Sequence, residues 1–118
     1  MIQGYKDLKV YQRSYNAAVK MYQISSLFPS EERYGLISQI KRAATSIPLN
    51  IAEGYGKHES ASEFKRFLTM AIGSCNEMQV LIDLAKDLEY INSDLHDNIS
   101  KEYDEIVRML VVLKKNWV

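Results

Sequence analysis

The sequence has few residues that end or bend helices, with only five glycines and two prolines in 118 positions. Its single cysteine, Cys75, excludes an internal disulfide and is compatible with a reducing compartment. The amino terminus lacks the apolar segment of a signal peptide, and no apolar run is long enough to span a bilayer. We therefore expect a cytoplasmic protein with one domain, residues 1–118, built mainly from long helices.

Patterns that support catalysis or metal binding are also missing. The two histidines, His58 and His96, do not follow a glutamate by three positions, as the Glu-x-x-His pairs of bundle metal sites require. Neither histidine is near a plausible nucleophile in the sequence. The Gly54–Gly56 stretch ends a predicted helix instead of preceding one, so it is not a phosphate loop. We predict that the protein is not an enzyme and needs no metal or cofactor.

The net charge is zero, because 15 Lys and Arg balance 15 Asp and Glu. This balance argues against strong nonspecific binding to nucleic acid. The charges are unevenly distributed, however: residues 1–66 hold ten Lys/Arg against six Asp/Glu, and residues 67–118 hold five against nine. A local basic surface on the first half of the chain is therefore compatible with the neutral total.

Four segments have helical periodicity, and none alternates polar and apolar residues as a strand does. The predicted helices cover residues 6–25, 31–55, 61–90 and 93–116. Ser30 is the expected N-cap of the second helix, Ser60 with Glu63 forms a capping box for the third, and Asn92 caps the fourth. Short connections between four helices predict an all-α, antiparallel, up-down-up-down four-helix bundle.

The second predicted helix contains Pro48 within its apolar face. Proline removes the hydrogen bond to the Ala44 carbonyl, so the helix either kinks at this point or breaks into two. The apolar spacing keeps its phase through Pro48, which favours the kink. We expect Gly54 and Gly56 to end the helix, with a positive φ at one of them.

A polar stripe lies beside that apolar face, at spacings of three and four residues. One interpretation is structural: the stripe bonds to the third helix, through Arg66, Ser74 or Glu77, and satisfies polar groups near the proline. The other interpretation is a contact with a ligand or a second subunit. We favour the structural one. The stripe consists of Gln39, Arg42, Ser46, Asn50 and Glu53.

Basic residues form a further stripe on the first helix, where Asp7 is the only accompanying acid. Solvated basic faces are usual on bundle helices, but such a stripe also suits contact with phosphate. Basic residues near the turn between the second and third helices would extend it. The candidate nucleic-acid contacts are Lys6, Lys9, Arg13, Lys20, Lys57, Lys65 and Arg66.

The first and third helices carry apolar residues on two faces. On the first helix we assign the seam of Leu8, Tyr11, Tyr15, Ala18 and Tyr22 to the core. The remaining apolar strips would be exposed in a monomer unless broad core contact covers them, so they favour self-association. The candidate interface residues are Val10, Ala17, Met21, Gly73, Val80 and Leu84.

Nearly the whole chain resembles a known family. The stretches DLKVYQ, FPSEERYGLISQIKRAATSIPLNIAEGYGK, SEFKRFLTMAIGSCNEMQ and IVRMLVVL are similar to four-helix-bundle proteins encoded by intervening sequences in bacterial 23S ribosomal RNA genes. The most specific parts are Ser46-Ile47-Pro48, then Asn50-Ile51-Ala52-Glu53-Gly54, then Gly73-Ser74 with Glu77. The same family includes accessory proteins of diversity-generating retroelements, which act with a reverse transcriptase and its template RNA.

The resemblance implies a homo-oligomeric, pentameric barrel of bundles, without catalysis and with contact to RNA or a ribonucleoprotein. The retroelement members are basic, whereas this chain is neutral, which favours a plain intervening-sequence-type protein. Two functional hypotheses follow. The first is an RNA-associated scaffold or an accessory protein to a retroelement reverse transcriptase, and the second is a protein-only assembly module.

Overall fold

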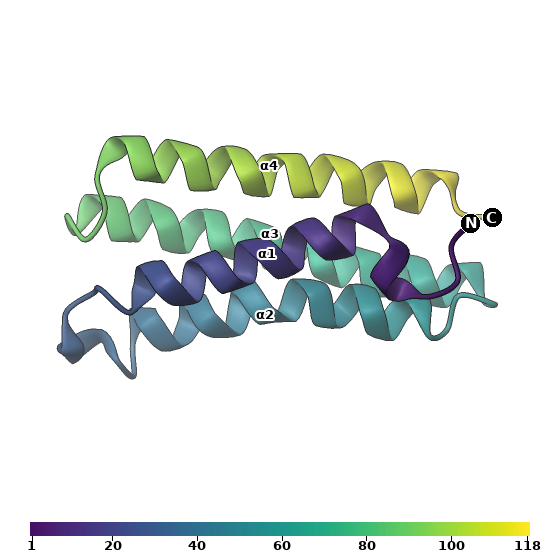
Figure 1. Cartoon of the computed structure of the whole chain (residues 1–118), viewed down its shortest axis with the longest axis horizontal. Coiled ribbons are helices and arrows are strands. Elements are labelled where there is room, and N and C mark those ends of the chain that lie inside the picture. The colour runs from purple at the N-terminus through teal and green to yellow at the C-terminus, as the bar shows by residue number, and fades with distance from the viewer.

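The computed structural model describes all 118 residues and contains helices but no β-strand. Its four long helices are α1 (Lys9–Ser25), α2 (Leu36–Tyr55), α3 (Ala61–Asp87) and α4 (Ser93–Asn116). Two 3-10 turns, η1 (Tyr5–Asp7) and η2 (Ser30–Glu32), precede α1 and α2. The helices run side by side in alternating directions, and both chain termini lie at the same end (Figure 1). The predicted all-α, up-down-up-down bundle is confirmed.

All four helices contribute to one continuous apolar core. The central residues include Ile47 of α2, Leu68 and Met78 of α3, and Ile106 of α4, each of which is fully buried. Burying one such side chain contributes about 1.5–3 kcal/mol relative to leaving it exposed. The burial of one face of every helix therefore holds the bundle together.

The start of α2 differs from the prediction, which began this helix at residue 31. Residues 30–32 form η2, and α2 begins at Leu36 after the N-cap Gly35. Ser30 makes no capping bond. The Glu32 carboxylate replaces it, since Oε1 accepts a hydrogen bond from the Leu36 amide at 3.2 Å and Oε2 accepts one from the Tyr90 hydroxyl at 2.8 Å. The prediction of Ser30 as the N-cap is therefore wrong, because the Glu32 carboxylate, held by the Tyr90 hydroxyl, bonds to the first turn of α2 instead.

Two other helices are shorter than predicted. The first helix begins at Lys9 instead of residue 6, because residues 5–7 form a 3-10 turn in which the Asp7 carboxylate accepts hydrogen bonds from the Gln3 and Gly4 amides. The third helix ends at Asp87 instead of residue 90, because Glu89 has a positive φ of 65°.

The N-caps of α3 and α4 are those predicted. Ser60 Oγ accepts a hydrogen bond from the Glu63 amide at 3.3 Å, and Asn92 Oδ1 accepts one from the Leu95 amide at 2.8 Å. Each bond satisfies one of the free amides of a first helical turn. The Glu63 carboxylate pairs with Arg66, three residues later, instead of reaching back to Ser60.

Helix α2 continues through the buried Pro48, so it does not break into two helices. The expectation of a positive φ at Gly54 or Gly56 is wrong, because no glycine in the chain has one. Gly54 instead serves close packing: a Cβ added there would lie 2.5 Å from Phe67 Cβ of α3. Only a residue without a side chain permits this approach of α2 to α3.

Candidate functional site

The apolar residues of the first helix are oriented as predicted only in part: Leu8 and Ala18 of the assigned seam are buried in the core. Val10, Ala17 and Met21, proposed as interface residues, are 3%, 6% and 1% exposed and belong to the core. Tyr15 and Tyr22, assigned to the core, are 53% and 42% exposed. The small residues on the buried face let α1 approach its neighbours, while a tyrosine packs its ring and keeps its hydroxyl in water.

The exposed face of α1 forms an open groove with α2, which we call the tyrosine groove. Its volume is about 540 Å³. Leu49 of α2 projects into it and is 66% exposed, although it is a large apolar residue. Neighbouring rings along its α1 side are close, with centroids 4.9 Å apart for Tyr5 and Tyr11. The lining residues carry no charge and are Tyr5, Tyr11, Tyr15, Ala18, Val19, Tyr22, Thr45, Pro48, Leu49 and Ala52.

A second uncovered apolar surface lies on α3, as predicted for this helix. Val80 and Leu84 are 59% and 46% exposed. Gly73 belongs to the same face, and a Cβ added there would meet nothing within 4 Å. With Met70, which is 44% exposed, we call these residues the α3 strip; Glu77, paired with Arg42, lies on the same side of the helix. Helical spacing gives Met70, Gly73, Val80 and Leu84 a common side of α3.

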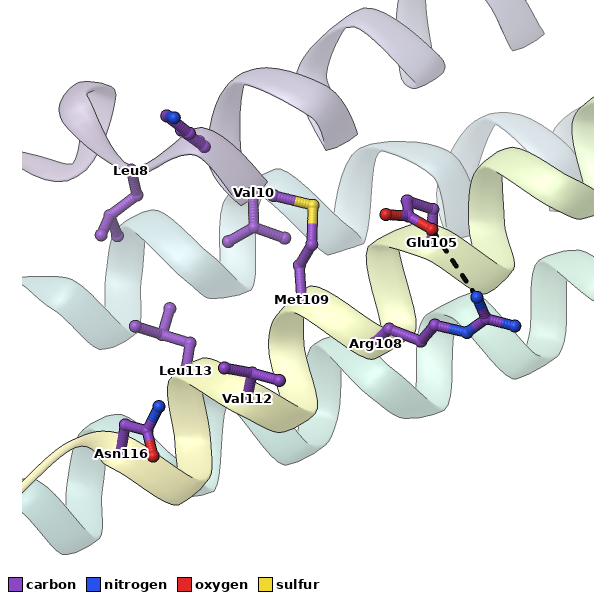
Figure 2. A pocket seen from close by; sticks show the side chains of 9 residues that line it. Leu8, Val10, Glu105, Arg108, Met109, Val112, Leu113 and Asn116 are labelled. Carbon is purple, nitrogen blue, oxygen red and sulfur yellow. Dashed lines mark ion pairs between the residues drawn. The ribbon is translucent and has the colours of Figure 1, made fainter.

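A third apolar surface is a hollow between α1 and α4, shown in Figure 2. Leu8, the N-cap residue of α1, and Val10 face Met109 and Leu113 of α4 across it, while Arg108 lies at its edge. Its volume is about 470 Å³. The hollow lies where α1 and α4, the two least closely packed neighbours of the bundle, diverge.

The polar stripe of α2 bonds within the chain. Arg42 Nη2 lies 2.6 Å from Glu77 Oε2, which is the bond to α3 that the structural interpretation requires. Asn50 Nδ2 donates to the Ser46 carbonyl, and the Ser46 hydroxyl donates to the Ala43 carbonyl, both at 2.8 Å. The outer members, Gln39 and Glu53, are exposed to solvent.

The basic stripe of α1 is partly neutralised by α4. Arg13 forms a bidentate ion pair with Glu102, at 2.7 Å from Nη2 to Oε1 and 3.0 Å from Nε to Oε2. The hydrogen bonds to Glu102 raise the pKa of Arg13 above its usual value. Lys20 lines a hollow that also contains Glu102. Arg13 and Lys20 therefore face an acidic neighbour, which weakens their assignment as phosphate contacts.

The other basic candidates lie together at one end of the bundle, which we call the terminal end (residues 1–12, 50–66 and 110–118; Figure 1). Its basic residues are Lys6, Lys9, Lys57, Lys65, Arg66, Lys114 and Lys115. Its acidic residues are Asp7, Glu53, Glu59 and Glu63. Lys114 and Lys115 are additions to the predicted set, because the sequence alone indicates only that they end a helix.

The opposite end, which we call the far end (residues 22–40 and 81–98), has the reverse charge. Its acidic residues are Glu31, Glu32, Asp83, Asp87, Glu89, Asp94 and Asp97, against only Arg33 and Lys86. The bundle measures 44 Å along its longest axis. A chain of zero net charge therefore folds into a molecule with a basic end and an acidic end.

Aromatic side chains join the segments of the terminal end. The rings of Trp117 and Phe64 lie edge to face with centroids 4.7 Å apart, and the Trp117 indole donates a hydrogen bond to the His58 carbonyl at 3.4 Å. Lys57 Nζ and the Arg66 guanidinium lie 5.0 Å and 4.6 Å from the centroid of the Phe67 ring. These contacts hold the end of α4 and its lysines against the turn between α2 and α3.

The titratable groups Cys75, Tyr103 and His96 are buried or paired within the chain. Cys75 is fully buried, and this burial raises the pKa of its thiol to about 12. Burial also raises the pKa of Tyr103, whose hydroxyl has no hydrogen-bond partner. His96 is paired with Asp83 at 2.7 Å and Asp97 at 3.1 Å, and hydrogen bonds to these carboxylates raise its pKa. No three His, Cys, Asp or Glu side chains are arranged to hold a metal ion.

None of the helices combines the length and the apolar character that crossing a membrane requires. Comparison with curated proteins gives no match. The chain is similar to a solved protein of unknown function from the S23 ribosomal protein family of Bacteroides thetaiotaomicron, with 27% identity and a TM-score of 0.82. The alignment covers 91% of this chain and 99% of that protein.

The sequence also matches a family model, that of the 23S rRNA-intervening sequence proteins, over residues 6–112. The match includes all of α1, α2 and α3 and most of α4. It also contains the Ser46–Gly54 stretch, with the buried Pro48 and the close contact at Gly54. The chain therefore belongs to the 23S rRNA-intervening sequence protein family.

Proposed function

We propose that this protein is a non-catalytic, homo-oligomeric scaffold. The observation that supports the proposal is the presence, besides the hollow between α1 and α4, of two uncovered apolar surfaces on different parts of the chain, the tyrosine groove and the α3 strip. Contiguous apolar surface of this kind marks an interaction site on a soluble protein. Tyrosine is also among the residues enriched in protein interfaces.

The tyrosine groove of one copy accepts the α3 strip of the next. The groove is lined by apolar and aromatic atoms, and Val80 with Leu84 offers an aliphatic ridge without a charge of its own. The open space beside Gly73 permits close approach of the partner backbone. Since two different surfaces meet, the contact is heterologous, and repetition produces a ring if the rotation closes.

The positions of the two surfaces favour a small ring. The groove lies between α1 and α2, whereas the α3 strip lies beside the α2–α3 side, where Glu77 pairs with Arg42. Because the two surfaces lie on different sides of the bundle, each contact rotates the next copy in the same sense, and repetition closes a ring. We propose for this ring the pentamer that the family resemblance implies.

The family description links these proteins to intervening sequences of 23S rRNA, and it supports RNA or a ribonucleoprotein as the partner of the scaffold. Action beside a retroelement reverse transcriptase is the alternative within the same class. A protein-only assembly module is favoured by one observation, the zero net charge of the chain. In all three cases the protein contributes a surface and no reaction.

Light scattering after size exclusion tests the proposal directly. The wild type is expected to have several times the mass of the 13.6 kDa chain. Leu49→Glu in the groove and Val80→Glu in the strip each introduce an unpaired charge and are expected to dissociate the ring with helicity retained, because both positions are exposed in the single chain. Val112→Glu is the matched control, since Val112 is 57% exposed and lies outside both surfaces.

A monomeric wild type at micromolar concentration would overturn the scaffold proposal. Dissociation by Val112→Glu alone would assign the contact to the hollow between α1 and α4 instead. Val10→Glu is not a useful interface variant, because Val10 is 3% exposed and the change would unfold the bundle.

A further inference from the structure

We propose that the terminal end of the bundle is the surface that binds the phosphate backbone of RNA. This inference rests on the proposed ring, and it names the partner class and the side chains that contact it. Its basis is the separation of charge along the molecule, with seven Lys/Arg against four Asp/Glu at the terminal end and seven Asp/Glu against two Lys/Arg at the far end.

Charge pairing within the bundle leaves most of the terminal-end cations available. Arg66 is occupied by Glu63, at 3.0 Å from Nε to Oε2. None of the lysines of this end forms an ion pair within the chain, since the salt bridges involve arginine or histidine in every case. Lys57 and Lys115 are exposed, and they come from segments that Trp117 holds together.

The symmetry of the ring repeats the basic residues of the terminal end once in every copy. The helices that carry the two contact surfaces run along the long axis of the bundle, so a side-by-side contact places the long axis of every copy roughly along the ring axis. Cyclic symmetry then gives all terminal ends the same direction. One rim of the ring carries the lysines of every copy, and the opposite rim carries the acids, which repel a polyanion. Linked contacts on one rim gain affinity without any new chemistry.

The mode of binding follows from the residue types. Lysine ammonium groups contact phosphate as point charges and do not read base edges, so RNA hairpins of different sequence are expected to bind with similar affinity. Each lysine–phosphate contact releases counterions, so the affinity falls steeply as the salt concentration increases. The far end takes no part in this binding.

The test is fluorescence anisotropy of a labelled RNA hairpin over a salt series, with the oligomeric state of every variant measured in parallel. Lys57→Glu/Lys115→Glu is expected to weaken binding at least about tenfold and to reduce the salt slope by about two. Lys86→Glu/Lys101→Glu is the matched control, because it changes the charge equally at exposed positions outside the terminal end and is expected to stay within about twofold of wild type.

Each contrary result has a distinct meaning. Equal losses in the two double variants, or no binding by an intact ring at low salt, would overturn the terminal-end surface and leave the scaffold proposal standing. Tighter binding to phosphatidylserine vesicles or to a DNA duplex than to the hairpin would overturn the assignment to RNA. A monomeric wild type would overturn the scaffold and, with it, the multiplication of charge on which this inference depends.

Discussion

The α2–α3 side and the α1–α4 side of the bundle are built differently. On the α2–α3 side the backbone of Gly54 approaches Phe67 so closely that a Cβ would lie 2.5 Å from Phe67 Cβ. On the α1–α4 side the helices diverge around a hollow of about 470 Å³, and a bidentate ion pair between Arg13 and Glu102 connects them. Close packing defines the first contact, whereas polar bonds and an open apolar surface define the second. This difference predicts that α2 and α3 carry most of the stability and that α1 is the easier helix to displace.

Truncating one apolar side chain on each side is expected to give the largest change in the free energy of unfolding. Ile47→Ala, in the fully buried part of α2, is expected to lower the free energy of unfolding by about 2–5 kcal/mol through lost burial and a residual cavity. Leu8→Ala is expected to stay near the lower limit, because Leu8 borders a hollow that is already open. Urea unfolding of both variants measures the difference. A larger loss for Leu8→Ala would reverse the order of the two sides.

Two glycines give a matched test of close packing. Gly54→Ala is expected to destabilise the protein by about 1–3 kcal/mol, because the new methyl group overlaps Phe67 and the backbone has to shift. Gly73→Ala, tested in the dissociated Val80→Glu background because Gly73 lies in the proposed contact surface, is expected to stabilise the helix by about 0.5–1 kcal/mol through the better helix propensity of alanine. Thermal unfolding of the two variants checks both signs, and a neutral Gly54→Ala would mean that the α2–α3 contact is adjustable.

The two interhelical arginine pairs allow a finer comparison. A double-mutant cycle on Arg13 and Glu102 is expected to give a coupling energy of up to about 1 kcal/mol, since the pair is bidentate and partly shielded. The cycle on Arg42 and Glu77 is expected to give less, because one contact joins them and Arg42 is 64% exposed. Both values are expected to decrease at high salt. A stronger Arg42–Glu77 coupling would show that polar bonds also contribute to the α2–α3 contact.

The smallest expected effect is a pH dependence at the α3–α4 contact. The carboxylates of Asp83 and Asp97 raise the pKa of His96 above 6.5, so the folded state binds a proton more tightly than the unfolded state. This stabilisation is complete below the unfolded pKa of about 6.5 and is lost as the pH rises through the folded pKa. Thermal unfolding of wild type and His96→Gln across this range tests it. An equal pH dependence of the two proteins, or a histidine pKa below 6.5 by NMR, would contradict the prediction.

Helix type and number could be predicted from the sequence because periodicity and caps are local. Ser60 and Asn92 act on residues three positions away, so their roles are visible in the sequence. The orientation of α1 could not be predicted in this way, since both of its faces have apolar residues at helical spacing. Only the packing of the folded chain decides between them. Val10, Ala17 and Met21 are buried, and of the assigned seam Leu8 and Ala18 are also buried, whereas the large side chains of Tyr15 and Tyr22 remain partly exposed.

The candidate surfaces could be predicted only in part, because some of their features depend on residues that are far apart in the sequence. Val80 and Leu84 are exposed as expected, because α3 has a single face wide enough to form the core. Pairing of Arg13 with Glu102 joins residues 89 positions apart, and no local pattern indicates it. The terminal end likewise combines charges from three separate segments, so its basic character exists only in the folded chain.

The contact of Trp117 with Phe64 and His58 also provides a spectroscopic probe. Trp117 is the only tryptophan of the chain, so intrinsic fluorescence at long excitation wavelengths originates from one known position. Its indole packs edge to face against Phe64 and bonds to the turn between α2 and α3. Release of the carboxyl-terminal turn of α4 would expose the indole and shift its emission to longer wavelengths. An unlabelled protein can therefore be followed at the same end of the bundle that is proposed to contact RNA.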